Sequence, residues 1–214
     1  MIDMLRFPDS LRPSPADKKI IALEGVDASG KSTLCVELER KYSNCKFIKI
    51  PEIYVTPPLK DYLWTKASTI GNALIYMASL VDRKSMMDAL HDDSIEYLIT
   101  DRSLWSTVVV DYVHHPEYTQ SVIDAFASIS AFLPIPNKIL ILDVPYQICR
   151  NRIMQRSADV KKYDTMSETE YQKHISFYHW LEANDIGVSM IPYAGLTDIT
   201  SSAELLYQTM QEKN

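Results

Sequence analysis

A glycine, four further residues, a second glycine, a lysine and a serine follow one another from Gly25 to Ser32. This GxxxxGK[ST] spacing comes directly after a short apolar run and before a stretch with helical periodicity, as a phosphate-binding loop requires. Glycines let the backbone curl around phosphate oxygens, and N–H groups at a helix N-terminus then face the anion. We expect nucleotide phosphates to contact the whole loop: Gly25, Val26, Asp27, Ala28, Ser29, Gly30, Lys31, Ser32 and Thr33.

Lys31 and Ser32 have separate tasks in such a loop. An ammonium at the position of Lys31 reaches the β- and γ-phosphates, and a hydroxyl at the position of Ser32 ligates Mg²⁺. The predicted cofactors are therefore Mg²⁺ and ATP as the phosphate donor. A plain strand-to-helix turn is the alternative interpretation of the same residues.

A second candidate group follows another apolar run, at Asp101-Arg102-Ser103. A carboxylate at a strand end can orient Mg²⁺ or its water, so Asp101 joins Ser32 as a predicted metal ligand. The planar guanidinium of Arg102 is suited to holding a substrate phosphate. A strand-end ion pair, or a helix capped by Ser103, is the non-catalytic alternative. Asp143 also ends an apolar run, but no basic residue follows it directly, so it is the second candidate for the metal-orienting acid.

Basic residues are crowded into a short stretch of this acidic chain: Arg150, Arg152, Arg156, Lys161 and Lys162. A phosphoryl-transfer transition state spreads negative charge over the γ-phosphoryl oxygens, so cations on a closing loop lower the barrier and exclude water. Arg152 and Arg156 share one face of a predicted helix, and we expect them to act in this way. A solvated, charged helix face is the alternative, and we favour it for Arg150.

Size and composition limit the classes of protein that fit. The 214 residues, 46% of them hydrophobic, are enough for one compact domain with a sizeable core. A formal net charge of −6 favours a small charged ligand over a nucleic-acid polymer. The three cysteines form no CxxC pair, which argues against a zinc site or a disulfide framework. No apolar run is long enough for a bilayer and no signal peptide is evident, so we expect a cytoplasmic protein without a membrane partner.

Short apolar runs alternate with helix-like stretches along most of the chain. The runs are the expected strands: residues 20–23, 47–50, 97–100, 139–142 and 188–191. The expected helices are longer: about residues 31–43, 70–91, 104–132, 146–156, 167–184 and 200–213. This order predicts an α/β fold with a parallel sheet covered on both faces. Ligands of such sheets bind beyond the carboxyl ends of the strands, where the candidate residues lie.

The N-terminal residues differ from this pattern. Residues 1–17 contain Pro8, Pro13 and Pro15 among polar residues, so we expect a flexible N-terminal arm. The remaining residues, 18–214, are expected to form one domain that carries all of the candidate chemistry.

Three segments resemble those of the thymidylate kinase family. Leu23–Thr33 resembles the family's phosphate loop, including the internal Asp27. Asp101–Ser106 is similar to its DRYxxS segment, and Leu142–Pro145 to the start of its LDVPPE segment. The resemblance spans about residues 19–192 and implies transfer of the γ-phosphoryl group of ATP to a nucleoside monophosphate. It also implies a three-layer P-loop fold with a five-stranded parallel sheet and a helical lid, often in a homodimer.

The resemblance also bears on the basic stretch. Some members of the family carry an arginine inside the phosphate loop, at the position of Ala28 here. A basic lid at about residues 153–166 is expected to supply the cations instead. Lys162 lies where the family often has Asp-Arg-Phe-Glu, so it joins the two arginines. The predicted catalytic residues are Lys31, Asp101, Arg102, Arg152, Arg156 and Lys162.

The acceptor side departs from the family pattern. The family usually has an arginine near the Pro-Glu after the second strand to grip the acceptor phosphate, but Ile50–Ile53 contains none. Tyr76 and Arg83 share a helix face and loosely match a stacking Phe and its following Arg. Asp111 stands near the base-contacting position and could favour a base with an exocyclic amine; an exposed helical Asp is the alternative. The predicted acceptor-binding residues are Glu52, Tyr76, Arg83, Arg102, Trp105 and Asp111.

Two other functions remain open. A deoxynucleoside kinase, of a related family, uses a Glu after the second strand as general base and a Glu-Arg-Ser motif, and Glu52 and Asp101–Ser103 could take those roles. The missing acceptor-phosphate arginine favours this hypothesis, because a nucleoside brings no charge, whereas Asp27 and Asp143–Pro145 favour the monophosphate kinase. A non-catalytic nucleotide-binding module is the third hypothesis, but binding alone needs no basic lid. In each case the expected partner is a small nucleotide or nucleoside.

Overall fold

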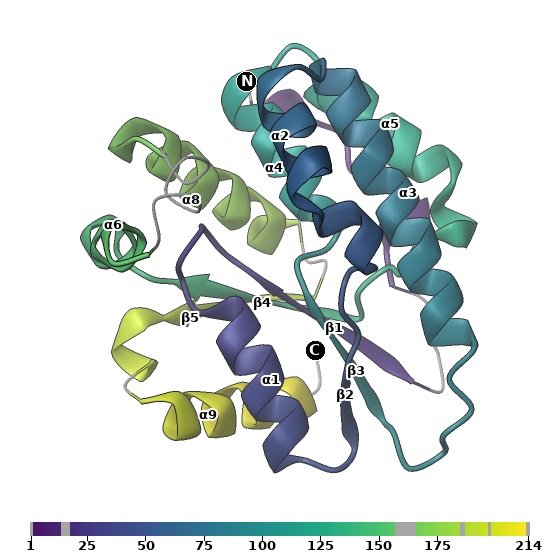
Figure 1. Ribbon diagram of the computed structural model, residues 1–214, viewed down its shortest axis with the longest axis vertical. Helices are drawn as coiled ribbons and strands as arrows, with labels where there is room; N and C mark the ends of the chain where they lie inside the picture. Colours follow the sequence, from purple (N-terminus) through teal and green to yellow (C-terminus); the bar gives the residue numbers. More distant parts are fainter. Residues whose placement is uncertain (1, 14–17, 157–165, 185–186, 197, 213–214) are drawn as a thin grey trace.

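The computed structural model describes residues 2–13, 18–156, 166–184, 187–196 and 198–212 (Figure 1). Its centre is a five-stranded sheet in the order β2-β3-β1-β4-β5, and every neighbouring pair of strands is parallel. The strands are β1 (Lys19–Glu24), β2 (Cys45–Phe47), β3 (Tyr97–Asp101), β4 (Lys138–Asp143) and β5 (Val188–Pro192). The predicted α/β fold with a five-stranded parallel sheet is therefore confirmed.

Helices cover both faces of the sheet, because successive strand side chains point to opposite faces and each face carries its own core. One core contains Ala22, Ile139 and Ile141. It is covered by α3 (Thr69–Asp88), α4 (Leu104–His114), α5 (Thr119–Ser128) and α8 (Glu168–Ala183). The other core contains Ile21 and Leu140. It is covered by α1 (Lys31–Lys41) and α9 (Ile199–Gln211), on the opposite side of the sheet in Figure 1, and α6 (Tyr146–Met154) contributes Cys149 to it.

The register of the strands brings the candidate residues to one edge. Leu23 of β1 is opposite Asp101 of β3, and Glu24 is opposite Ile141 of β4. The chain segments that follow β1, β3 and β4 therefore leave the sheet at nearly the same level. This is the carboxyl edge at which ligands of parallel sheets bind.

Three elements differ from the expected pattern. β2 ends at Phe47, and the chain passes Pro51, which has no N–H to donate to a sheet, into a 3₁₀ turn, η3 (Glu52–Val55). The expected helix over residues 104–132 is divided into α4 and α5 with Pro116 between them. α2 (Pro57–Thr65) is not among the expected helices, although its first residue is a proline, which is favourable there. No helix in the described part of the chain is long and apolar enough to cross a bilayer.

In place of the expected flexible arm, residues 2–13 lie against the domain. Leu11 is only 2% exposed and belongs to the core that α3, α4, α5 and α8 cover. The ring of Phe7 stacks on that of Trp105 at a centroid distance of 5.1 Å, and Arg6 N donates to Gln120 Oε1 over 2.8 Å. The proline-rich composition concealed this docking, which depends on apolar side chains between the prolines. Residues 14–17 lie outside the described part of the chain.

Docking of this segment predicts a measurable contribution to stability. Leu11→Ala should lower the free energy of unfolding by about 2–4 kcal/mol, because it leaves a cavity in the core. Met4→Ala is the matched control: its side chain is 81% exposed, and its effect should stay within about 0.5 kcal/mol. Urea denaturation of both variants and the wild type measures this. Equal stability of the three proteins would show that the segment does not dock.

Candidate active site at the phosphate loop

The loop between β1 and α1 depends on backbone conformations that most residues avoid. Gly25 has a φ of 134°, and Gly30, which precedes α1, has a φ of 108°. A Cβ on Gly25 would lie 2.9 Å from the carbonyl oxygen of Leu142 in β4, so this approach to the neighbouring strand requires glycine. Ala28 is also left-handed, with a φ of 63°. The backbone geometry of the loop therefore explains why both of these positions in the sequence motif are glycine.

The side chain of Lys31 lies beneath the loop. Its Nζ donates to the carbonyl oxygens of Gly25 and Val26 over 2.9 and 2.8 Å, and to Ser29 Oγ over 3.3 Å. Burial lowers the pKa of Lys31 to about 8, against the raising effect of Asp27 and Asp101. The ammonium is still largely protonated at neutral pH, so a cation is available beside the loop.

Ser32 and Asp101 are brought together as predicted. Ser32 Oγ donates to Asp101 Oδ2. Asp101 Oδ1 is buried, and no described residue forms a hydrogen bond with it. Hydroxyl and carboxylate oxygens are ligands that Mg²⁺ prefers, and Mg²⁺ in kinases is usually held by one or two such groups plus phosphates. The pair therefore fits a Mg²⁺ ion, whereas Asp143, the second candidate, does not line the pocket described below.

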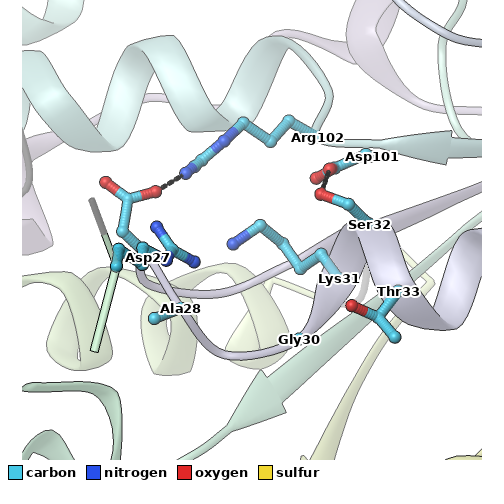
Figure 2. Close-up of a pocket in the computed structure, with 9 residues that line it drawn as sticks. Asp27, Ala28, Gly30, Lys31, Ser32, Thr33, Asp101 and Arg102 are labelled. Atoms are coloured by element: carbon cyan, nitrogen blue, oxygen red, sulfur yellow. Dashed lines mark hydrogen bonds and ion pairs between the residues drawn. The ribbon is translucent and has the colours of Figure 1, made fainter. Parts of the chain in front are cut away.

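Arg102 forms an ion pair with Asp27 across the loop. Figure 2 shows Asp27, Lys31 and Arg102 pointing into one space, with the Ser32–Asp101 pair beside them. Burial raises the pKa of Asp27, but the charges of Arg102 and Lys31 outweigh burial, and the net effect is a lowered pKa. Burial lowers the pKa of Arg102, but Asp27 and Asp101 raise it above its ordinary value. Both members of the pair are therefore charged at neutral pH.

These side chains surround a pocket of about 240 Å³. Its lining is polar and mostly charged: Asp27, Ala28, Gly30, Lys31, Ser32, Thr33, Asp101, Arg102 and Arg156. The volume lies below the range of about 300–1,000 Å³ for whole small-molecule sites. It suits a phosphate group more than a complete nucleotide.

The predicted lid arginines have two different positions. Arg156 lines the pocket, whereas Arg152 Nη1 donates to the carbonyl oxygens of Ala28 and Ser29 over 3.0 and 3.1 Å. Arg152 thus holds the loop backbone. Lys162 and most of the expected lid lie outside the described residues.

Two predicted acceptor residues are buried instead of lining a cleft. Trp105 is 1% exposed and packs between the rings of Phe7 and Phe177. Arg83 is also 1% exposed, and its Nη1 donates to the Arg102 carbonyl oxygen over 2.9 Å. Sequence reasoning placed both on the correct elements, but helical spacing did not give the direction of the side chains. In this structure Trp105 belongs to the core and Arg83 supports Arg102.

Tyr76 and Glu52 differ in how close they lie to the phosphate pocket. Burial raises the pKa of Tyr76. The charge of Arg102 lowers this pKa and that of Asp27 raises it, so Tyr76 lies close enough to the phosphate pocket to interact with both charges. Glu52 is exposed in η3 and does not line the pocket. Its role toward an acceptor stays a prediction.

Asp111 is buried at 4% exposure, which contradicts the exposed alternative, and its contact with a base stays a prediction. No described residue forms a hydrogen bond with its Oδ2 atom. Burial raises the pKa of Asp111 to about 6, and His115 lowers it only partly.

Two buried polar residues of the site were not predicted. Glu24, the last residue of β1, is 0% exposed and accepts three hydrogen bonds, which are described below. His174 of α8 is 5% exposed, its Nδ1 lies 3.0 Å from the Glu170 carbonyl oxygen, and burial lowers its pKa to about 4, so it is neutral. An acidic residue that ends an otherwise apolar strand was the available signal for Glu24. His174 gave no sequence signal beyond its position in a helix.

A five-stranded parallel sheet with this loop at its carboxyl edge defines the fold class of the P-loop kinases. The family model for thymidylate kinase matches residues 23–184. The chain belongs to the thymidylate kinase family. This confirms the resemblance found in the sequence.

Individual relatives are distant. A probable thymidylate kinase of Metallosphaera sedula is 25% identical over 139 residues, which cover 64% of this chain and 66% of the relative's length. Among solved structures, deoxyadenosine kinase from M. mycoides with bound dATP has a TM-score of 0.67 and 17% identity, covering 90% of this chain and 100% of that one. Thymidylate kinase from Candida albicans has a TM-score of 0.59 and 21% identity, with coverages of 92% and 93%. At these identities the solved structures show the fold alone.

The buried carboxyl group of Asp111 predicts a pH-dependent stability. Between about pH 4 and pH 6 the unfolded chain loses this proton while the folded protein retains it, so folding is increasingly penalised as pH rises, by up to about 3 kcal/mol. Asp111→Asn removes the penalty. The unfolding free energy of the variant minus that of the wild type should therefore increase by about 2 kcal/mol when the pH is raised from 4 to 7.5.

Urea denaturation at the two pH values measures this change. Val110→Asn is the control, because Val110 is exposed on the same helix as Asp111 and carries no titratable group, so the difference between this variant and wild type should not depend on pH. A constant difference for Asp111→Asn would contradict the prediction.

Proposed function

We propose that the protein transfers the γ-phosphoryl group of ATP to a nucleoside monophosphate, dTMP or a related deoxynucleotide. The observation that carries the proposal is the convergence of Lys31, Ser32, Asp101 and Arg102 on one pocket, in a chain of the thymidylate kinase family. A cation, a pair of oxygen ligands and a guanidinium are the groups that phosphoryl transfer needs. The name of the curated relative, a probable thymidylate kinase, supports the same chemistry.

The donor half of the mechanism follows from the loop. ATP places its phosphates against the loop, and Lys31 exchanges its bonds to the Gly25 and Val26 carbonyls for bonds to the β- and γ-phosphates. Ser32 and Asp101 would hold Mg²⁺, which would neutralise charge on these phosphates. The unpaired Asp101 Oδ1 supports this role, because a buried carboxylate oxygen needs a partner.

The transfer step depends on cations around the moving group. Arg102 and Arg156 line the same pocket as Lys31. Lys162, which lies outside the described residues, remains a predicted further cation of this set. These charges stabilise the transition state, and the pocket positions donor and acceptor. No covalent intermediate with the protein is required.

A nucleoside acceptor is the second candidate. Two observations favour it: Arg83 donates to a backbone carbonyl, and Arg102 is already paired with Asp27. Neither guanidinium is therefore directed only at an acceptor phosphate, and a nucleoside would need no such cation. Glu52 would then act as the general base on the 5′-hydroxyl.

An acceptor screen separates the two candidates. With ATP and Mg²⁺, we expect turnover of dTMP or dCMP and not of thymidine or deoxycytidine. Lys31→Ala should lower kcat by at least about 10²–10³-fold, because it removes a cation from the transition state. Lys41→Ala is the control. Lys41 lies at the end of the same helix as Lys31 but pairs with Glu204 of α9, so its loss should leave kcat unchanged.

Product analysis by chromatography gives both readouts. Consumption of nucleosides alone would reject the monophosphate acceptor in favour of the second candidate. Full activity of Lys31→Ala would reject the donor scheme.

Buried thiols support a cytoplasmic location as part of the proposal. Cys35, Cys45 and Cys149 are all buried and free. Burial raises the pKa of Cys45 to about 12 and that of Cys149 to about 11, so these thiols stay protonated and inert. Buried free thiols suit a reducing compartment.

We also propose a homodimer that pairs through α3. This helix exposes Ile70 and Leu74 at 56% and 57%, one turn apart on one face. Ile53 in η3 and Tyr62 in α2 are also exposed, at 68% and 48%, and Figure 1 shows α2 beside α3. Large apolar side chains exposed on neighbouring elements are suited to a protein contact. A second copy of the chain would cover them.

Sedimentation equilibrium tests the homodimer. The wild type should have twice the mass of the chain, and Leu74→Glu should have the mass of a single chain, because a charge in an apolar contact is costly. Val36→Glu is the control, since Val36 is 50% exposed on α1 and should not affect assembly. A monomeric wild type would contradict the proposal.

A further inference from the structure

Arg102 has an unusual backbone for a residue with a large side chain. Its φ is 68°, in the left-handed region, which is unfavourable for a residue with a Cβ atom. Arg102 also forms the ion pair with Asp27 at the edge of the phosphate pocket. A strained conformation of this kind persists only where neighbouring contacts hold it.

Glu24 makes the contacts that follow Arg102 directly. Its Oε1 accepts from both the backbone N and the Oγ of Ser103, each over 2.7 Å. Its Oε2 accepts from Ser106 Oγ over 2.5 Å. Glu24 is 0% exposed, so these bonds lie in a low-dielectric environment without competition from water. One carboxylate therefore fixes the chain on the C-terminal side of Arg102.

The same network reaches the guanidinium of Arg102. Ser106 Oγ donates to Glu24 and accepts from Arg102 Nη1 over 3.3 Å. Because the hydroxyl proton points to Glu24, the oxygen lone pairs are directed to the arginine. The backbone of Arg102 is held from two other sides: its N donates to the Leu23 carbonyl over 3.0 Å, and its carbonyl accepts from Arg83 over 2.9 Å.

We infer that Glu24 is a positioning residue for the proposed phosphoryl transfer, and that it acts through Ser103 and Ser106 to hold Arg102 against the pocket. The inference rests on the proposed function for its kinetic consequence, but its structural consequence can be measured without turnover. Glu24 does not touch the pocket, so it does not itself contact a phosphate. Its effect is to keep the guanidinium of Arg102 at the edge of the phosphate pocket.

Two substitutions test the network at different points. Glu24→Gln keeps the size of the side chain but replaces one acceptor oxygen by an NH₂ donor, so one serine hydroxyl loses its acceptor. Ser106→Ala leaves Glu24 in place and removes only the bridge to Arg102. The matched controls are Glu37→Gln, a carboxylate of α1 that pairs with Arg40, and Ser202→Ala, a buried serine of α9.

The kinetic arm separates positioning from binding. In Glu24→Gln and Ser106→Ala, kcat/KM for the acceptor should fall by about 10²-fold, as small displacements of a catalytic group do. The dissociation constant for ATP with Mg²⁺, measured by calorimetry, should change less than about twofold. The double variant should be no worse than Glu24→Gln alone, because both act through one path. Both controls should match the wild type.

The spectroscopic arm does not need turnover. In protein labelled with ¹⁵N-arginine, the guanidinium signal of Arg102, assigned by its loss in Arg102→Lys, should show restricted rotation in the wild type. That restriction should be lost in Glu24→Gln and in Ser106→Ala. An immobile Arg102 in both variants, with only a lower melting temperature, would overturn the inference. If the wild type has no kinase activity, the proposed function fails and the spectroscopic result still decides the role of Glu24.

Discussion

Burial of charge at the carboxyl edge of the sheet is the constraint on which the site depends. Three carboxylates, Glu24, Asp27 and Asp101, lie beneath and beside the loop together with the cations Lys31, Arg83 and Arg102. Each is held by hydrogen bonds or an opposite charge, as buried ions require. Arg152 at the loop and Arg156 at the pocket add two further positive charges. The excess of positive charge at this edge suits an anionic ligand such as a phosphate group.

The sequence predicted the donor half of the site because its signals are local. The glycines, Lys31 and Ser32 lie within one strand–loop–helix unit, and the identity of Gly25 follows from a backbone conformation that only glycine adopts well. The parallel sheet was equally accessible, because buried strands appear as apolar runs. Pairing of Ser32 with Asp101 needed one further step, the rule that parallel strands end at a common edge.

The acceptor half could not be predicted to the same depth. Trp105, Arg83 and Asp111 stand on the expected helices, but their directions depend on contacts that are distant in the sequence. Trp105 faces the core because Phe7, almost a hundred residues earlier, stacks on it. That contact in turn depends on docking of the N-terminal segment, which proline content had indicated to be flexible. The stacking of Phe7 on Trp105 therefore could not be predicted from the proline content of the segment.

The contacts of the arginines show why residue type alone does not predict which side chains meet a substrate. Ala28 and Arg102 are the described non-glycine residues with positive φ, and both border the phosphate pocket. Beside each of them another arginine donates to a backbone carbonyl: Arg152 to Ala28 and Arg83 to Arg102. A guanidinium that donates to carbonyls holds the shape of the backbone, and its fork is then less free to grip a phosphate. Two of the arginines expected to meet a substrate, Arg152 and Arg83, thus contact the strained backbone beside the pocket in this structure.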